Sequence, residues 1–465
     1  MYNRLAMPKS PTVDVTLDVS PLPSSTVESE PDSPFHILLI GDFSGRASRG
    51  LVEPLLGRRP IFIDRDEIDN VIRALDVQLQ LPLRDEKAAA VLEIKTLDDF
   101  HPDCIYATQP LFSALRQRRA QLNQNAGAGP EPGRERPPEA PSSFVNGSLL
   151  DAIAATADAV PLPRKEELVR IEERIAREMR ELLHHPLFQS LESAWRALDW
   201  LVRHTDTNHL LKLYILDASK VEILADLATA SDLRTTGLYR ILVAHPVQDE
   251  PWALIGADLY FRPWIDEVEL LARLAMIADR AGAPLLAGAD PSIVGLKSFD
   301  DTAETVSNLG EPNAVWQEAR QAPEACRIGL ALPRFLVRSP YGQGSSPLDS
   351  FAYERMLAAT HLNYLWANPM YACVQLIARA FAIDRWEMHP GRLCELEDLS
   401  MHTCTEGGDF EIKSGAEFLL DPEAAERITA AGLMPLLTTK DSGSVRIGIF
   451  QSIADPPAPL EGRWL

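Results

Sequence analysis

The sequence predicts an α/β fold, in which a small α/β domain is linked to a larger α/β domain with a mixed sheet and covering helices. Two observations predict it. Short apolar runs with strand character alternate with segments whose apolar residues recur every three or four positions, as on one face of a helix. A stretch rich in Pro, Gly and Ala, residues 124–147, lacks this periodicity and reads as a linker between residues 1–123 and 148–465.

The first region begins with the alternating segment TVDVTLDV, which places Val13, Val15, Leu17 and Val19 on one face of a strand over residues 12–19. A stretch rich in Pro and Ser separates this strand from the rest of its region. The strand can pair within its own chain, as most strands do, or it can be an arm that adds to the sheet edge of a neighbouring subunit.

The rest of the first region predicts a compact α/β unit. The apolar run at residues 35–40 is typical of a buried strand. Asp64 and Glu67 have the spacing of a capping box, which predicts a helix directly after them. The remaining segments complete the unit, with strands expected at residues 77–81 and 90–94 and helical structure at residues 97–122.

The second region starts with helices and continues with strands. Amphipathic helices are predicted over residues 164–186 and 185–206, because their apolar residues recur at helical spacing. Apolar runs then alternate with helical segments, which indicates a mixed or parallel sheet with helices on its faces. The strands are expected at residues 210–218, 239–245, 252–261, 283–289, 326–332, 410–420 and 444–452.

Composition and charge narrow the class of protein. The hydrophobic fraction of 46% and the charged fraction of 24% are ordinary for a globular chain of 465 residues. The formal net charge of −22 argues against binding to nucleic acids or to anionic membranes, since both require a basic surface. The five cysteines are scattered without a CxxC pair, and no run of about 18 apolar residues occurs. We therefore expect a cytoplasmic protein that is not embedded in a membrane.

The run FHILLIGDFSGR ends in a glycine-rich turn similar to the start of a phosphate-binding loop. Such a loop places Lys and then Ser or Thr after its second glycine, whereas Arg46 and Ala47 follow Gly45 here. The side chains that would hold phosphate and magnesium are therefore missing. We expect Gly41, Asp42 and Gly45 to form a structural turn, and a nucleotide-binding enzyme is the weaker alternative.

No set of residues in the sequence predicts catalysis or a cofactor. Neither a G-x-S-x-G nor an H-E-x-x-H motif occurs. His389, Cys394, His402 and Cys404 are the best candidates for metal binding, but their spacing matches no zinc template, and buried thiols with surface histidines are the simpler interpretation. We expect no catalytic residues, no metal and no cofactor.

Two arginines, Arg334 and Arg338, lie among apolar residues in the segment LPRFLVRSPYG. A buried guanidinium group requires a negatively charged partner, and this acidic chain has many carboxylates. We therefore expect both arginines to pair with Asp or Glu side chains.

An ordered series of motifs resembles the contractile sheath of the type VI secretion system. The runs PFHILLIGDFSGR, RRPIFIDRDEIDNVI and LEIKTLDDFHPDCIY resemble the small sheath subunit, and TVDVTLDV lies where that subunit carries its N-terminal strand. After the linker, HHPLFQSLESAWRALDWLV, WALIGADLYF, APLLAGADPSIVGLKSF, IGLALPRFLVRSPYG and GLMPLLTTKDSGSVRIGIFQS resemble the large subunit. The chain is therefore similar to a fusion of both subunits.

The resemblance implies a structural, non-enzymatic part of a contractile injection system. In this family the sheath polymerises around an inner tube, and its contraction drives the tube outward. The expected partners are copies of this chain or other sheath subunits, the tube protein and the baseplate. Family large subunits continue well past the last motif, whereas this chain ends soon after it. The alternative is therefore a sheath-like accessory, a cap or a baseplate-adjacent adaptor.

The resemblance also implies a site for the AAA+ ATPase that recycles contracted sheaths. In the family this ATPase grips a short helix near the start of the large subunit, where the segment SLLDAIAATAD lies in this chain. Leu149, Leu150, Asp151 and Ile153 are the matching positions. The three apolar side chains form a stripe that suits a binding groove, although such a stripe can also pack on its own domain.

Overall fold

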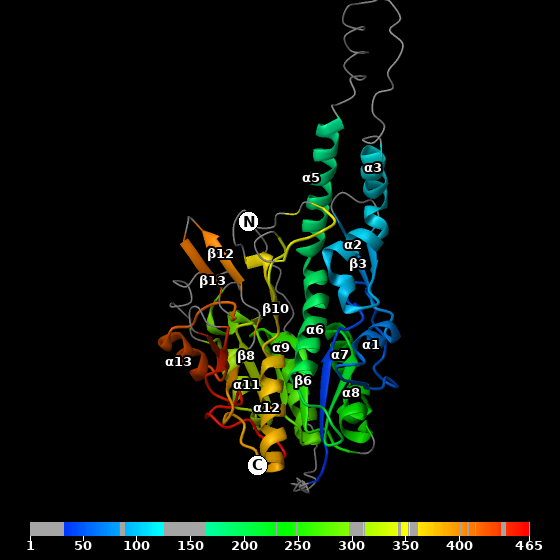
Figure 1. Ribbon diagram of the computed structural model, residues 1–465. Coiled ribbons are helices and arrows are strands. Elements are labelled where there is room, and N and C mark those ends of the chain that lie inside the picture. The colour runs from blue at the N-terminus through cyan, green and yellow to red at the C-terminus, as the bar shows by residue number, and fades with distance from the viewer. Residues whose placement is uncertain are drawn as a thin grey trace, which may run out of the picture.

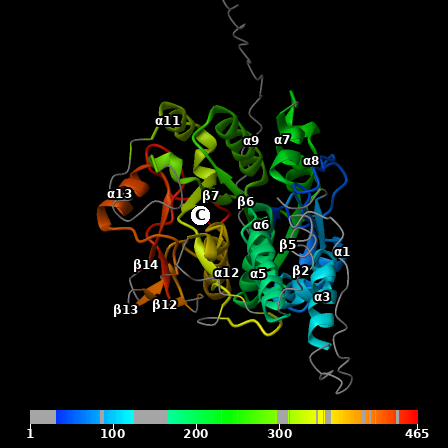
Figure 2. The same cartoon turned by 90° about the horizontal axis from the view of Figure 1, so that it is seen from above.

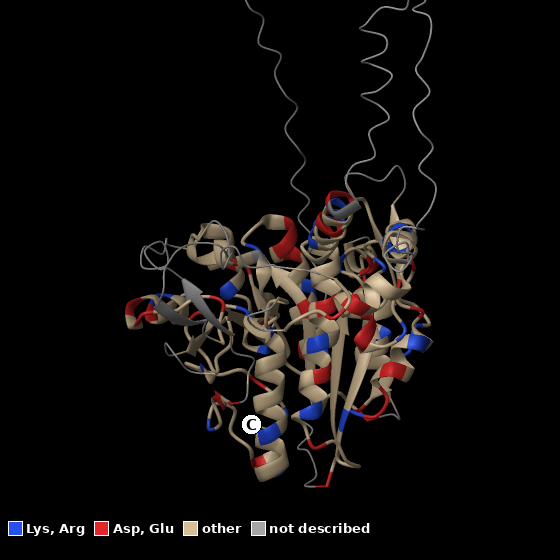
Figure 3. Ribbon diagram, turned by 45° about the horizontal axis from the view of Figure 1, so that its top comes forward, with Lys and Arg blue, Asp and Glu red and all other residues tan. Residues whose placement is uncertain are grey.

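The computed structural model shows an α/β protein with helices on both faces of a large sheet (Figures 1 and 2). Charged residues lie mainly on the helices and loops, whereas the central strands carry few (Figure 3). The structure describes residues 32–83, 89–124, 164–228, 230–247, 250–296, 310, 312–342, 346–351, 353, 361–397, 399, 402–406, 409–413, 415–438 and 443–464.

The main sheet has nine strands within the described residues, in the order β11-β15-β14-β8-β7-β6-β1-β5-β2. The six strands from β14 to β5 run parallel, and β2, β15 and β11 pair antiparallel at the two edges. The predicted mixed sheet is therefore confirmed. The strands are β1 Phe35–Gly41, β2 Ile61–Ile63, β5 Leu211–Asp217, β6 Leu254–Phe261, β7 Leu285–Ala289, β8 Ile328–Leu332, β11 Glu395–Leu396, β14 Met434–Thr438 and β15 Val445–Ile447.

Strand β1 is an inner strand of the sheet, the third from the β2 edge, and all seven of its residues are buried. Phe35, Ile37 and Leu39 pack into the hydrophobic core on one face, and Leu38 and Ile40 pack into the core on the other. Side chains alternate along a strand, so a strand that is covered on both faces is apolar throughout. This is why the run is so strongly apolar in the sequence.

Both of the strands that flank β1 come from the second region of the sequence. β1 pairs in parallel with β5 on one side and with β6 on the other. β2, from the first region, extends the sheet beyond β5. The two regions on either side of the linker therefore share one sheet and one pair of cores.

Helices cover the sheet in two layers (Figure 2). Buried residues of α5, α6 and α12 belong to one core, and those of α7, α8, α9, α11 and α13 belong to the other. The α-helices are α1 Ile68–Ala74, α2 Pro102–Thr108, α3 Ser113–Gln124, α5 Arg164–Leu183, α6 Pro186–Arg203, α7 Lys220–Ala228, α8 Gly237–Tyr239, α9 Ile265–Ala281, α11 Ala314–Arg320, α12 Met370–Asp384 and α13 Pro422–Ala430.

Short elements complete the structure. Three two-stranded sheets pair β3 Gln78–Leu81 with β4 Ala90–Glu93, β9 Phe335–Arg338 with β10 Leu365–Ala367, and β12 His402–Glu406 with β13 Asp409–Lys413. The short helical turns are η1 Leu97–Phe100, η2 Pro110–Phe112, η3 Leu233–Thr235, η4 Arg240–Ala244, η6 Pro291–Val294, η7 Pro323–Arg327, η8 His361–Asn363 and η9 Arg385–Glu387.

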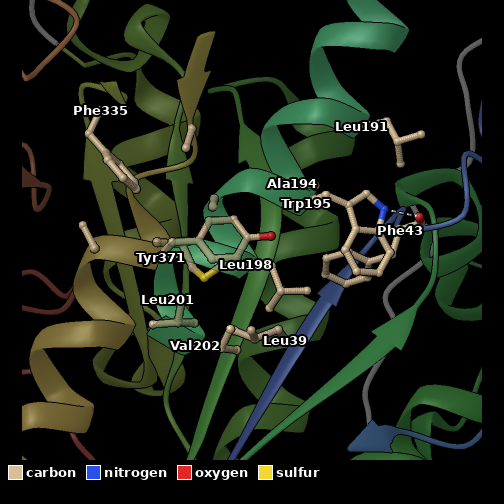
Figure 4. Packing of buried hydrophobic residues seen from close by; sticks show 14 of the residues in the cluster. Leu39, Phe43, Leu191, Ala194, Trp195, Leu198, Leu201, Val202, Phe335 and Tyr371 are labelled. Atoms are coloured by element: carbon tan, nitrogen blue, oxygen red, sulfur yellow. Dashed lines mark hydrogen bonds between the residues drawn. The ribbon is translucent and has the colours of Figure 1, made fainter. Parts of the chain in front are cut away.

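Aromatic side chains join the first region to helix α6. The indole Nε1 of Trp195 donates a hydrogen bond of 2.8 Å to the carbonyl oxygen of Phe43, and the two rings lie 5.7 Å apart (Figure 4). Both side chains are fully buried. A buried indole N–H needs such an acceptor, because leaving it unpaired costs about 1–3 kcal/mol.

The prediction of a strand at residues 239–245 is wrong. Residues 239–245 form the end of α8 and the π-helical turn η4 instead of a strand. The Asp226 carboxylate accepts hydrogen bonds from the amides of Gly237 and Leu238, and the Thr236 hydroxyl accepts one from the Tyr239 amide. These interactions satisfy the free amides at a helix start, so the apolar run that follows is helical.

The predicted capping box is also absent. Helix α1 begins at Ile68 after Glu67, whose side chain makes no capping hydrogen bond. The Asp64 carboxylate instead accepts hydrogen bonds from the amides of Asp66 and Glu67, at 3.0 and 3.1 Å, and stabilises the turn before the helix.

The predicted strand at residues 410–420 is shorter than expected, since β13 ends at Lys413.

Candidate functional site

The glycine-rich turn lies directly after Gly41, at the carboxyl end of β1. The Asp42 carboxylate accepts hydrogen bonds from the amides of Arg46 and Ala47, at 2.6 and 2.8 Å. Gly45 has a φ of +76°, and a Cβ atom there would lie 2.3 Å from the carbonyl oxygen of Gln78. Both the backbone conformation and the close approach therefore require glycine at this position.

The amides of this turn are already occupied by a carboxylate. The amides of Phe43 and Ser44 each donate a hydrogen bond of 2.9 Å to Oδ1 of Asp217, at the end of β5. The Ser44 hydroxyl donates to Oδ2 of the same side chain, at 2.7 Å. Asp217 therefore takes the amides that a phosphate group would need, and its negative charge would repel a phosphate.

A buried carboxylate lies next to the turn and joins it to helix α7. The Glu222 side chain is fully buried, and it accepts hydrogen bonds from Arg46 at 2.9 Å and Arg58 at 2.6 Å. Burial alone would raise the pKa of Glu222, but hydrogen bonds from Arg58, from the amides of Ser219 and Glu53, and from Arg46 lower it to about 2. This cluster therefore stays ionised and fixes the loop after β1 to α7.

A cleft of about 380 Å³ opens beside the turn. It lies at the carboxyl ends of β1, β5 and β6, where the order of the parallel strands reverses. Ligands of open parallel sheets bind at such points, and pockets of about 300–1,000 Å³ are typical. Its charged lining residues are Asp42, Lys220, Asp258, Arg262 and Glu267.

Two carboxylates of the cleft lack an ion pair with any cation that the structure describes. Burial raises the pKa of Asp258 to about 6 despite hydrogen bonds from Tyr371 and Asn368, and repulsion from Asp42 is a smaller cause in the same direction. Burial also raises the pKa of Asp42, with repulsion from Asp217 as a further cause. The cations in the lining are neutralised locally, because Lys220 pairs with Glu267 and Arg262 pairs with Asp290. The cleft therefore has an excess of negative charge.

The predicted pairing of Arg334 and Arg338 with carboxylates is confirmed. Arg338 binds Glu192 of helix α6 through Nε at 2.7 Å, and Arg196 binds the same carboxylate at 2.8 Å. Arg334 binds Glu417 through Nε at 2.8 Å. The side chains of Glu192 and Glu417 are both fully buried. Both pairs connect segments that lie far apart in the sequence, so they fix tertiary structure.

The candidate metal residues occupy different places. His402 is buried in β12, and its Nδ1 lies 3.1 Å from the Tyr364 hydroxyl. Cys404 belongs to the same strand, whereas His389 and Cys394 lie between α12 and β11. Within the part of the chain that the structure describes, no three His, Cys, Asp or Glu side chains form a group that could hold a metal ion.

Sequence reasoning missed the carboxylates that organise this region. Asp217 and Asp258 lie at or near the ends of two apolar strands, and Glu222 lies at the start of the following helix. Acidic residues that follow successive parallel strands meet where the carboxyl ends of those strands lie side by side. Their positions in the sequence could therefore have indicated a cluster of carboxylates. Their partners could not be identified, because these depend on which strands are neighbours.

The two candidate assembly segments lie outside the described residues, and their roles stay predictions. They are the arm residues Val13, Val15, Leu17 and Val19, and the ATPase-binding positions Leu149, Leu150, Asp151 and Ile153.

Comparison with known families finds two matches, one after the other along the chain. Residues 165–454 match the VipB family, described as EvpB/VC_A0108, tail sheath N-terminal domain, and this match alone covers more than half of the chain. Residues 7–127 match the family described as type VI secretion system, VipA, VC_A0107 or Hcp2. The chain belongs to the type VI secretion sheath family. The resemblance seen in the sequence is thus confirmed, with VipA and VipB domains in one chain.

A curated relative supports the same assignment. The type VI secretion system sheath protein TssC1 of Pseudomonas aeruginosa strain PAO1 is 29% identical over 305 residues. The aligned part is 62% of this chain and 61% of the relative, so this sheath-family chain spans less than two thirds of the relative's length. The family is one of structural sheath proteins, not of enzymes. No helix in the described ranges is long and apolar enough to cross a membrane.

Proposed function

We propose that this chain is a structural subunit of a type VI secretion contractile sheath and that it supplies both sheath-subunit parts in one polypeptide. The observation that carries the proposal is the shared sheet: β1, from the VipA-like part, lies between β5 and β6 of the VipB-like part. The two parts form one body through burial on both faces of β1. Such a body is suited to be the repeating unit of a helical assembly.

Contraction would draw its energy from packing between neighbouring subunits. An extended lattice that relaxes to one with more buried interface releases free energy, at about 25 cal/mol per Å² of apolar surface. The ion-paired clusters around Glu192, Glu222 and Glu417 hold each subunit rigid while the contacts between subunits change. The proposed partners are other sheath subunits, the inner tube protein, the baseplate and the AAA+ ATPase, in the cytoplasm.

The assembly proposal is tested by electron microscopy of the purified full-length chain, alone and with its tube protein. We expect helical or tubular polymers, formed by the chain alone or in the presence of the tube. Persistent monomers with the tube protein and partner components present would contradict the sheath role. That result would favour a sheath-like accessory, such as a cap or an adaptor near the baseplate.

A further inference from the structure

The cleft beside the glycine-rich turn combines apolar walls with two carboxylates that lack a cation. Asp42 and Asp258 lie in its lining, and no cation that the structure describes pairs with either of them. The cations closest to them are bound elsewhere: Lys220, Arg262 and Arg46 pair with Glu267, Asp290 and Glu222, respectively. The apolar lining comes largely from helix α6, together with strands β3 and β6, and comprises Leu79, Leu187, Leu191, Ala194 and Leu259.

This lining suits a ligand that carries both a positive charge and an apolar part. The charge would supply the cation that the two carboxylates lack, and the apolar part would be buried against α6. Arg and Lys side chains among apolar residues have this combination, since their stems are apolar and their heads are charged. A short basic and apolar peptide is therefore the class of ligand that the cleft fits.

One segment of this chain has these properties. Residues 1–10, MYNRLAMPKS, lie outside the described residues and carry Arg4 and Lys9 among apolar side chains, with no acidic residue before Asp14. Every other stretch outside the described residues that carries Lys or Arg also carries Asp or Glu. In a chain with a net charge of −22, this segment is therefore complementary in charge to the cleft.

We propose that residues 1–10 dock in the cleft of their own molecule. Residues 11–31 connect this segment to the described chain just before β1, and when extended they reach up to about 70 Å. The cleft lies at the other end of β1, which spans only about 23 Å, so the segment can reach it. A tethered segment has an effective concentration on the order of millimolar, which favours its own cleft over that of another copy.

Docking has a consequence for the predicted arm, residues 12–19, which directly follows the segment. A docked segment keeps the arm on its own subunit, so the arm becomes available to a neighbour only after residues 1–10 leave the cleft. The docking contact is independent of the proposed sheath function, and only this consequence for the arm rests on it.

A labelled peptide with the sequence of residues 1–10 tests the docking on the full-length chain. In the wild-type chain the tethered segment competes for the cleft, so the peptide should bind weakly. Arg4→Glu combined with Lys9→Glu reverses both charges of the tethered segment and removes this competitor. We expect the peptide to bind the double variant at least tenfold more tightly than the wild-type chain. Fluorescence anisotropy measures the binding, and circular dichroism verifies that every variant is folded.

Two further substitutions, each added to the double variant, locate the bound peptide. Ala47 is an exposed residue of the lining, so Ala47→Lys places a competing positive charge beside the carboxylates and should weaken peptide binding at least tenfold. Ala228→Lys is the matched control, because Ala228 is exposed at the opposite end of α7 from the lining residue Lys220. It should alter binding less than about twofold.

Three results would contradict the proposal. A peptide that binds neither the wild-type chain nor the double variant would show that the cleft does not take this segment. Equal binding to both chains would show that the tethered segment does not occupy its own cleft. Binding that survives Ala47→Lys would place the peptide outside the cleft. Sheath assembly is unaffected by these outcomes, because it is measured separately by electron microscopy.

Discussion

At the scale of single residues, a comparison of Gly45 with Gly50 separates the cost of a steric clash with a neighbouring atom from the cost of a left-handed backbone conformation. Gly45 and Gly50 both have positive φ values, +76° and +63°. A Cβ at Gly45 would meet the Gln78 carbonyl at 2.3 Å, whereas a Cβ at Gly50 would meet nothing within 4 Å. We expect Gly50→Ala to cost about 1 kcal/mol for the left-handed conformation, and Gly45→Ala to cost clearly more, about 3 kcal/mol, because the turn must also move away from β3.

Urea unfolding midpoints of the two alanine variants compare these costs directly. A larger loss for Gly45→Ala supports the structural role of the turn. Equal losses would mean that the loop shifts without cost, and that the contact with Gln78 does not fix the turn.

His36 makes stability depend on pH. Its side chain is fully buried between the rings of Tyr214 and Trp252, and neither ring nitrogen has a hydrogen-bond partner among the described residues. Burial, followed by the nearby charges of Lys212 and Arg463, lowers the pKa of His36 from 6.5 to about 4. The folded protein therefore holds the histidine neutral at a pH at which the unfolded chain would protonate it.

The sign of the effect follows from this difference. Between pH 6.5 and pH 4 the unfolded chain binds more protons than the folded one, so stability is full above pH 6.5 and falls as the pH is lowered. The decrease in the free energy of unfolding that His36 causes reaches up to about 3 kcal/mol. In urea unfolding at pH 7 and pH 4.5, His36→Phe should reduce the difference between the two pH values. An unchanged difference would assign the acid sensitivity to other groups.

At the scale of elements, the apolar pattern was sufficient to predict each helix or strand that buries one or both of its faces regularly. It placed α5 and α6, with their regular apolar stripes, and the strands β1, β5 and β6. It failed at residues 239–245, where the run YRILVAH suits a strand or a helix equally well. The helix forms there because the amides of Gly237 and Leu238 donate hydrogen bonds to the Asp226 carboxylate, which lies on a different helix. Such a contact cannot be read from local sequence.

The segment that resembles the ATPase-binding helix gives a prediction at the same scale. Leu149, Leu150 and Ile153 would form the apolar stripe that enters the groove of the disassembly ATPase, so a charge within the stripe should abolish binding. We expect Ile153→Asp to reduce binding of the ATPase at least tenfold in a pull-down with the full-length chain.

Ala155→Asp is the matched control, because residue 155 would face away from the stripe on the same helix. It should leave binding within about twofold of the wild-type level. Equal binding by Ile153→Asp and the wild-type chain would remove this segment as the recycling site.

At the scale of the whole molecule, the sequence divides the chain in two, but the structure joins the halves through one sheet. The linker composition at residues 124–147 suggested two units, and the family matches follow the same division. The sequence did not show which strands are neighbours in the sheet, because β1 pairs with partners more than 170 residues away. The candidate site was hidden for the same reason, since its carboxylates meet only when β1, β5 and β6 lie side by side.

The shared sheet predicts that the linker is dispensable for folding. Residues 1–124 and 148–465, produced together as separate polypeptides, should purify as a one-to-one complex, because β1 fills the space between β5 and β6. The larger piece alone would expose the apolar edges and faces next to this space, so we expect it to aggregate. A pull-down through a tag on the larger piece measures the complex.

Two variants of the smaller piece identify the contact that holds the complex together. Leu39 is fully buried in β1, so Leu39→Asp should abolish co-purification, because burying an unpaired carboxylate costs several kcal/mol. Leu56 is 55% exposed, so Leu56→Asp should have no effect. A larger piece that is soluble alone, unfolds cooperatively and does not bind residues 1–124 would show that the two parts are independent domains. The proposed sheath subunit would then be a pair of tethered bodies instead of one rigid unit.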